Sequence, residues 1–329
     1  MKVKEVSLLE QDVRPSSVDI EDLSSPLFIA WQINSLCNLD CLHCCEEAGY
    51  QMPNELTKDE ALDLCRQITE MDIPYAAISG GEPMLCPYFF DAAKVITDNG
   101  ISLKVETNGH FIDEKTADKF KEFGFRSVQI SIDGVTPKTH EAMRIKGDWQ
   151  KAIDAVKRLV KRGINTEIVF VPTKFNLKET SQMIDLAASL GVYGFYTGKI
   201  MRIGRAAKNW DKLAPSEKDY EDFFNVLQKK EAEYKGKMKV YYYPYDVVEE
   251  LKYRMYNPSA SLLIIPNGKV KLIGPLPYLC GDLRKHSLKE IWQRYKQAWK
   301  RRDVLEFTQK VIKDHTLLAQ SNTWIELDI

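Results

Sequence analysis

Three cysteines in one short segment are the residues of this chain with the clearest capacity for metal chemistry. Cys37, Cys41 and Cys44 stand at spacings of four and three residues, directly after a short apolar run. Thiolates at such spacings can bind three irons of a [4Fe–4S] cube, which leaves the fourth iron open to chelation by a small molecule. A closed zinc site needs a fourth protein ligand, and Cys45 or His43 could supply it. The spacing therefore favours a cluster and leaves zinc as the alternative.

A glycine pair followed by an acid is the second segment of chemical interest. Residues 79–83 read Ser-Gly-Gly-Glu-Pro, one predicted strand-helix unit after the cysteines. The two glycines, Gly80 and Gly81, allow another group to approach the backbone closely. The carboxylate of Glu82 can neutralise an ammonium group. Taken alone, the segment would be an ordinary turn, and its position after the cysteines is what gives it weight.

Together the two segments resemble the motifs of the radical S-adenosylmethionine (SAM) enzymes. In that family a C-x-x-x-C-x-x-C loop follows the first strand, and a glycine-rich loop after the second strand receives the methionyl amino group. The resemblance covers about residues 27–205 and implies one [4Fe–4S] cluster, held by Cys37, Cys41 and Cys44, with SAM as the second cofactor. It also implies a set of cofactor-binding residues: His43, Gly80, Gly81, Glu82, Pro83, Thr107, Asn108, Ser131, Asp133 and Arg144.

The later members of this set follow the third and fourth predicted strands. Thr107 and Asn108 end the third strand, and Ser131 and Asp133 end the fourth. In relatives these positions line the cofactor pocket, and Arg144 corresponds to an arginine that approaches the SAM carboxylate. Each position alone also fits a turn or a solvated helix end, because Asn-Gly and Asp-Gly are common turn dipeptides.

The resemblance implies a reaction that begins at the open iron. An electron from a flavodoxin or ferredoxin would cleave SAM reductively, and the resulting 5′-deoxyadenosyl radical would abstract hydrogen from the substrate. The cofactor carries the difficult step, while the protein binds, orients and excludes water. Because such a cluster is sensitive to oxygen, we expect a cytoplasmic enzyme.

Six short apolar runs, alternating with segments of helical period, are expected to position these loops. The predicted strands are residues 28–33, 75–79, 102–106, 127–132, 165–171 and 194–199. Thr57 and Glu60 have the spacing of a capping box and start the first helix. Repeated strand-helix units form either a partial barrel or a doubly wound sheet. The resemblance implies the former, an α/β fold with a partial (βα)6 TIM-like barrel.

The pattern changes after residue 205 and predicts a small α+β extension. We expect helices over 216–235 and 287–301, and Asn267-Gly268 as a type I′ hairpin turn. The domains would be an N-terminal arm (1–26), the core barrel (27–205) and a substrate-capping extension (206–329). The extension resembles the SPASM/twitch region of enzymes that modify peptides. After Cys86 the only thiol is Cys280, and one thiol cannot hold the auxiliary cluster of those enzymes, so we expect a degenerate, cluster-free cap.

Cys280 itself has three interpretations. It can be a small buried hydrophobic residue, which needs no further explanation. It can also be an inert remnant of an ancestral cluster site. The catalytic hypothesis makes it a hydrogen-atom donor that quenches a substrate radical from the face opposite the deoxyadenosyl group.

Composition excludes several classes of partner. The 329 residues carry 46 basic and 47 acidic side chains, and the net charge of −1 gives no reason to expect nucleic acid as a partner. The longest apolar runs are far shorter than the roughly 20 residues of a membrane span. Seven cysteines without an export signal argue against a disulfide framework.

Three functions remain compatible with the sequence. The first is a radical SAM enzyme that abstracts hydrogen from a peptide or a peptide-derived cofactor precursor. The second is a radical SAM epimerase, dehydrogenase or decarboxylase that acts on a small molecule such as a sugar or nucleoside. The third is a non-catalytic zinc-binding protein.

Overall fold

A single sheet organises the part of the chain that the structure describes. The computed structural model describes residues 19–329, so the first 18 residues of the predicted N-terminal arm lie outside it. Within that range eleven strands form one sheet in the order β11-β10-β9-β8-β1-β2-β3-β4-β5-β6-β7. The strands are β1 (Phe28–Gln32), β2 (Tyr75–Ser79), β3 (Ser102–Thr107), β4 (Ser127–Ser131), β5 (Thr166–Phe170), β6 (Gly194–Gly198), β7 (Lys239–Tyr243), β8 (Ser261–Ile264), β9 (Lys269–Lys271), β10 (Tyr278–Asp282) and β11 (Ile325–Glu326).

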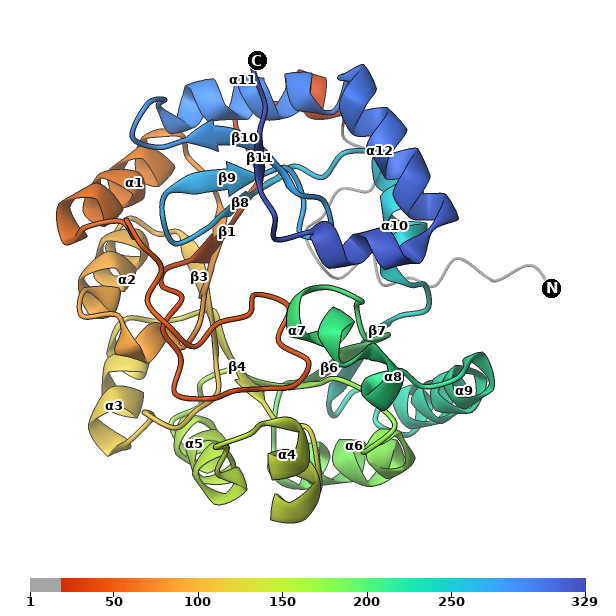
Figure 1. The fold of residues 1–329 in the computed structure, drawn as a ribbon. Coiled ribbons are helices and arrows are strands. Elements are labelled where there is room, and N and C mark those ends of the chain that lie inside the picture. Colours follow the sequence, from red (N-terminus) through yellow and green to blue (C-terminus); the bar gives the residue numbers. More distant parts are fainter. Residues whose placement is uncertain (1–18) are drawn as a thin grey trace.

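The first six strands are parallel neighbours in chain order, which confirms the predicted α/β class. Each of them begins and ends within two residues of its predicted bounds. Their helices lie on the outside and enclose the strands in a ring (Figure 1). Parallel connections of this kind place the loops after each strand at one end of the barrel, where such folds bind ligands.

The helices follow the amphipathic and capping signals of the sequence. Thr57 and Glu60 form the predicted capping box at the start of α1. The helices are α1 (Lys58–Glu70), α2 (Phe89–Asp98), α3 (Glu114–Glu122), α4 (Pro137–Met143), α5 (Trp149–Lys161), α6 (Thr180–Ser189), α7 (Gly204–Lys208), α8 (Trp210–Leu213), α9 (Glu217–Glu233), α10 (Val247–Arg254), α11 (Leu288–Ala298) and α12 (Arg302–Lys313). In α5 the apolar residues Ala152, Val156 and Leu159 are fully buried against the strands.

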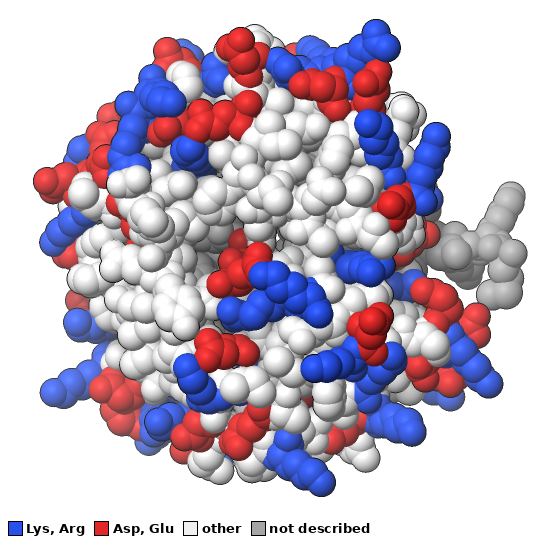
Figure 2. Space-filling view, viewed as in Figure 1, with Lys and Arg blue, Asp and Glu red and all other residues white. Residues whose placement is uncertain are grey.

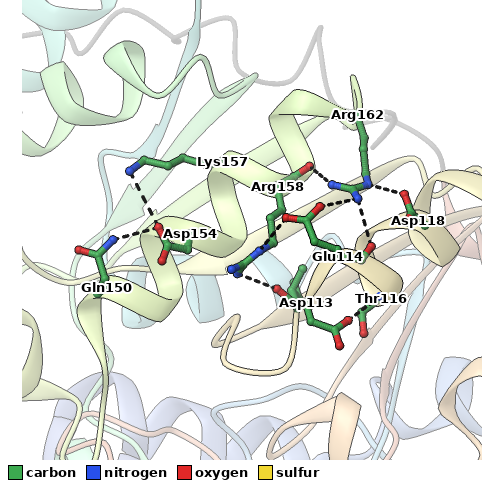
Figure 3. A network of polar contacts seen from close by, with 10 residues as sticks. Asp113, Glu114, Thr116, Asp118, Gln150, Asp154, Lys157, Arg158 and Arg162 are labelled. Atoms are coloured by element: carbon green, nitrogen blue, oxygen red, sulfur yellow. Dashed lines mark hydrogen bonds and ion pairs between the residues drawn. The ribbon is translucent and has the colours of Figure 1, made fainter.

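An ion-pair network joins α3 and α5 on the outer surface of this ring (Figure 3). The Arg162 guanidinium contacts the carboxylates of Asp118 and Glu114 at 2.7 Å each, and Arg158 lies 3.3 Å from Glu114. The carboxylates are exposed to solvent, so each pair stabilises the fold only modestly. The network fixes the packing of two helices and has no part in the site described below.

Two strands from the predicted extension join the parallel sheet on opposite sides. β7 pairs in parallel with β6, and β8 pairs in parallel with β1. The sheet of the barrel therefore continues into the extension, and the division of the chain near residue 205 stays a prediction. The extension also contacts the first helices, since the Arg284 guanidinium lies 2.6 Å from Glu60.

The hairpin between β8 and β9 forms as expected, but its predicted turn type is wrong. The Gly268 N–H donates to the Ile265 carbonyl at 2.9 Å, so the turn begins one residue earlier. Gly268 has a φ of 80°, whereas Asn267 has no positive φ and therefore cannot be in a type I′ turn. Pro266 has no N–H to pair with Lys269 across a two-residue loop, which explains the shift.

The surface of the described residues matches the balanced composition. On the face seen in Figure 2, acidic and basic side chains are interspersed around the rim and no large region carries one sign. Among residues 19–329, no helix combines the length and the apolar character that a membrane span requires.

Candidate active site

The cysteine loop crosses one end of the barrel. The chain between β1 and α1, drawn in red to orange, lies over the centre of the strands in Figure 1. Neighbouring loops hold it by backbone hydrogen bonds, because the Asp40 N–H donates to the Ile145 carbonyl at 3.0 Å and the Leu42 N–H to the Met143 carbonyl at 2.9 Å. The loop is thus fixed to the end of α4, directly above the strand ends.

A cavity of about 740 Å³ lies below this loop, inside the barrel. Cys37, Cys41 and Cys44 line one end, and Phe28 and Tyr75, the first residues of β1 and β2, line the other. This volume lies within the roughly 300–1,000 Å³ of typical ligand pockets. The cavity therefore extends from the C-terminal to the N-terminal ends of the strands.

Burial disfavours the thiolate form of two of these cysteines. It raises the pKa of Cys37 to about 11 and raises the pKa of Cys41 as well. Metal binding would displace these protons. A [4Fe–4S] cube takes one thiolate on each of three irons, and three thiols at one end of a cavity fit that need. Within residues 19–329, no three His, Cys, Asp or Glu side chains are placed to hold a single metal ion.

The two glycines after β2 pack against the backbone of the cysteine loop. A Cβ on Gly80 would lie 2.4 Å from the Asn34 carbonyl oxygen, and one on Gly81 would lie 2.2 Å from that of Leu36. The Gly81 N–H donates to the Asn34 oxygen at 2.8 Å. Both glycines also line the cavity. The two glycines therefore allow the loop after β2 to pack directly against the backbone of the cysteine loop.

Glu82 has a different position from the one expected. Its side chain is fully buried and does not line the cavity. One carboxylate oxygen accepts hydrogen bonds from the Thr107 hydroxyl at 2.7 Å and the Met84 N–H at 3.1 Å, and the other accepts from the Asn108 N–H at 2.9 Å. Burial raises its pKa despite these bonds. Glu82 thus joins its loop to the end of β3, and the expectation of direct contact with an ammonium is not supported.

Pro83 starts the short helix that follows and also lies outside the cavity lining.

A buried ion pair connects the ends of β4 and α4 with the cysteine loop. The Arg144 Nε lies 2.7 Å from the Asp133 carboxylate, and the His43 Nε2 lies 3.3 Å from the same oxygen. The Arg144 Nη1 also approaches the Cys41 Sγ at 3.6 Å. Although burial alone would raise it, the charge of Arg144 holds the pKa of Asp133 below its ordinary value. Burial lowers the pKa of His43 to about 4.

Two observations show that this end of the cavity fits a polar ligand. The buried Nδ1 of His43 has no hydrogen-bond partner within residues 19–329, and His43 lines the cavity. Arg144 also lines the cavity while its Nε is held by Asp133. An amphipathic cofactor with a charged amino-acid end matches such a wall.

The structure brings most of the predicted site residues to the cavity wall. These are Cys37, Cys41, Cys44, His43, Gly80, Gly81, Thr107, Asn108, Ser131 and Arg144. Asp133 lies behind the wall and acts through its contacts with Arg144 and His43.

Cys280 does not reach the cavity, so the geometry gives the catalytic hypothesis for it no support. Its side chain is fully buried in the core of the sheet, and its Sγ donates to the Val270 carbonyl at 3.5 Å. Burial raises its pKa to about 12. A hydrogen-atom donor must face the substrate, whereas Cys280 packs between β9 and α11 as a small hydrophobic residue.

Arg205, on α7, is absent from the predicted set and has a clear structural part in the site. Its Nε donates to the Cys41 carbonyl at 2.8 Å and its Nη1 to the Ala48 carbonyl at 2.6 Å. Its backbone N–H donates to the Cys44 carbonyl at 2.9 Å. These contacts span more than 150 residues of sequence, so no local pattern could have shown them.

Comparison with known proteins agrees with this geometry. Residues 31–187 match the model of the Radical SAM superfamily. The chain is 27% identical over 309 residues to the AdoMet-dependent heme synthase of Methanosarcina barkeri, an alignment that spans 87% of this chain and 88% of that protein. It is 30% identical over 209 residues to the mycofactocin maturase MftC of Mycolicibacterium smegmatis, spanning 62% of this chain and about half (52%) of that protein.

A solved structure shows the same fold. The SuiB protein of Streptococcus suis, bound to S-adenosylmethionine, superposes with a TM-score of 0.69 at 15% identity, over 82% of this chain and 66% of that chain. The three thiols at the cavity end, the glycine loop packed beside them and the parallel barrel below are the parts that such a domain requires. Residues 31–187 thus form a Radical SAM superfamily domain, and the enzymes of that superfamily use a [4Fe–4S] cluster and SAM.

Proposed function

We propose that this enzyme abstracts a hydrogen atom from a peptide, or from a peptide-derived cofactor precursor, whose reacting group enters the barrel cavity. In this proposal Cys37, Cys41 and Cys44 hold the cluster. When bound and reduced by one electron, the cluster and SAM supply methionine and a 5′-deoxyadenosyl radical. A flavodoxin or ferredoxin in the cytoplasm would supply the electron.

The observation that carries the proposal is the depth and size of the cavity. Its 740 Å³ must hold SAM at the cysteine end and the reacting part of the substrate beneath it. The space left beside SAM then receives only the reacting part of the substrate. A peptide can insert one side chain and leave its backbone outside, whereas a larger rigid molecule cannot.

The residues at the cysteine end of the cavity have binding and positioning roles in this proposal. Asp133 holds Arg144 so that the guanidinium stays beside the Cys41 thiol, where it can meet a carboxylate. Gly80 and Gly81 keep their loop against the cysteine loop. The enclosed barrel excludes water from a reactive radical.

Relatives support a peptide as the substrate. The aligned maturases are named for mycofactocin, and SuiB has been solved bound to its precursor peptide SuiA. The anSMEcpe protein has been solved with SAM and a Cp18Cys peptide, at a TM-score of 0.64 and 16% identity.

Isotope tracing is the experiment that tests the proposal. The chain is reconstituted with iron and sulfide without oxygen, reduced, and incubated with SAM and deuterated candidate peptides. We expect about four irons per chain, and transfer of deuterium from one peptide carbon into 5′-deoxyadenosine. Cys44→Ala should lose the iron and the SAM cleavage, while Cys65→Ala, a buried cysteine outside the cavity, should keep both. An iron-loaded chain that leaves SAM intact under strong reductant would refute the proposal.

A small-molecule substrate is the second candidate. The heme synthase relative aligns with 87% of this chain, which includes the part beyond residue 187, whereas the maturase alignment covers 62%. A deuterated small molecule, such as a heme precursor, sugar or nucleoside, that labels 5′-deoxyadenosine where no peptide does would favour this alternative.

A further inference from the structure

A second polar cluster lies inside the barrel, away from the cysteines. It consists of Lys104 and Glu106 on β3, Gln129 on β4 and Glu167 on β5, and we call these four residues the interior cluster. All four line the cavity. Side chains alternate along a strand, so Lys104 and Glu106 share the inner face while Leu103 and Val105 are buried on the outer face.

The adjoining wall leaves room beside this cluster. Ala30 on β1 and Ala77 on β2 face the same cavity and pair in register, and Ala77 also pairs with Lys104. Short side chains at these positions keep the interior open. The long polar side chains of β3, β4 and β5 therefore point toward free space and not toward a packed core.

Within the cluster, one carboxylate makes close polar contacts and the other does not. The Lys104 Nζ lies 2.8 Å from Glu167, and the Gln129 Nε2 donates to Glu167 at 3.3 Å. The Glu167 side chain is 5% exposed. The same ammonium lies 3.9 Å from Glu106, which is too long for a hydrogen bond. Lys104 also lies over the Tyr196 ring at 4.6 Å, so its position is fixed from two sides.

Glu106 thus keeps an accessible carboxylate within the barrel. Its side chain is 43% exposed, and because Glu106 faces inward, this exposure is to the cavity. The next residue, Thr107, bonds to Glu82 and leaves Glu106 uninvolved in the loop contacts.

Two other charged residues that line the cavity make contacts outside the interior cluster. Arg126 also lines the cavity, with its guanidinium over the Tyr75 ring at 5.2 Å, and Glu250 is paired with Arg254 at 2.6 Å. Glu106 accepts no hydrogen bond from residues 19–329. Its ion-pair contact is the 3.9 Å approach of Lys104, and a bound ammonium or guanidinium would add the charge-assisted hydrogen bond that Lys104 does not make.

We propose that Glu106, with Lys104 and Glu167 beside it, forms a subsite for a cationic group of the substrate, an ammonium or a guanidinium. The inference rests on the proposed function in that a peptide side chain would carry this group into the barrel. The carboxylate of Glu106 accepts a charge-assisted hydrogen bond from the cation. Glu167 keeps Lys104 turned toward itself, so Lys104 does not close the subsite.

Peptide binding tests this subsite without the radical reaction. The full-length, cluster-loaded chain with SAM is titrated with three capped tripeptides that differ in the central residue, which is lysine, norleucine or glutamate. We expect the lysine peptide to bind at least about tenfold more tightly than the norleucine peptide. Glu106→Gln should abolish that preference, and Glu122→Gln, an exposed glutamate on α3, should keep it.

A folding control, a second variant and a free amine complete the test. A thermal unfolding curve shows whether Glu106→Gln folds, and Glu106→Lys is a second variant that should prefer the glutamate peptide. No lysine preference in the wild type, or a preference that survives in folded Glu106→Gln, would overturn the subsite. Binding of free n-butylamine as tightly as the lysine peptide, with loss on Glu106→Gln, would support the subsite and overturn the peptide assignment.

Discussion

Arg144 joins three parts of the site through one guanidinium group. It contacts Asp133 at 2.7 Å and approaches the Cys41 sulfur at 3.6 Å, and both partners are buried. Removing one member of a buried ion pair leaves an uncompensated charge, which is more costly than the net value of the pair. The fold therefore depends on Arg144 before any cofactor is bound.

We predict that Arg144→Met lowers the free energy of unfolding of the apo chain by about 3–5 kcal/mol, because Asp133 loses its partner. Lys146→Met is the matched control, since Lys146 pairs with Asp40 at the surface with 66% of its side chain exposed. That control should cost about 0–1 kcal/mol. Denaturant unfolding followed by circular dichroism measures both. Equal effects of the two substitutions would contradict the proposed importance of the buried pair.

His140 gives the second prediction. It is buried, and its Nδ1 accepts a hydrogen bond from the Asp133 N–H at 3.2 Å. Burial lowers its pKa from 6.5 to about 4. Between these values the unfolded chain binds a proton that the folded chain does not, so stability is full above pH 6.5 and falls as the pH drops toward 4, by up to about 1.4 kcal/mol per unit.

Unfolding free energies measured between pH 4.5 and 7.5 test whether stability falls as the pH is lowered. His140→Asn should show a shallower loss toward low pH than the wild type. His315→Asn, at an exposed position, should follow the wild-type profile. A His140→Asn profile as steep as that of the wild type would mean that other groups cause the acid sensitivity.

The loops after β1 and β2 are held together by backbone contact, which makes Gly81 the most constrained position between them. A Cβ there would lie 2.2 Å from the Leu36 carbonyl oxygen and 2.7 Å from that of Ser35, and backbone atoms cannot move aside as a flexible side chain can. We predict that Gly81→Ala destabilises the chain by about 1–3 kcal/mol or more and lowers its iron content after reconstitution. Gly274→Ala, with nothing within 4 Å of the added carbon, should change neither quantity. Full iron loading of Gly81→Ala would show that the loops separate without harm.

The strands were predictable because short segments with buried apolar residues, such as Leu103 and Val105 of β3, alternate with longer segments of helical period. The position of the three thiols of the cysteine loop on the cavity wall followed from the same order of strands and loops. The burial of Cys280 and the hydrogen bonds that Glu82 accepts depend on residues distant in the sequence. The same is true of the hydrogen bonds from Arg205 to the cysteine loop. Spacing alone cannot show which face of a loop a side chain takes.

The sheet connects the barrel and the extension into one structure. β8 lies between β1 and β9, and its residue Leu262 is fully buried in the same core as Ile29 of β1. The Trp292 indole on α11 donates to the Leu23 carbonyl at 3.0 Å, ahead of the barrel in sequence. No edge of the described sheet separates the two predicted domains, so their unfolding should be coupled.

We therefore predict that Leu262→Ala, within β8, lowers the free energy of opening of β4 and β10 amides by the same amount, about 2–5 kcal/mol. Native-state hydrogen exchange read by mass spectrometry measures both strands in one experiment. Tyr256→Ala is the control, because 81% of Tyr256 is exposed, and it should change neither. If only the β10 amides lose protection, the extension opens without the barrel, and the continuous sheet does not act as one cooperative unit. Equal loss in both strands would mean that the barrel and the extension open together, so that the cavity exists only in the fully folded chain.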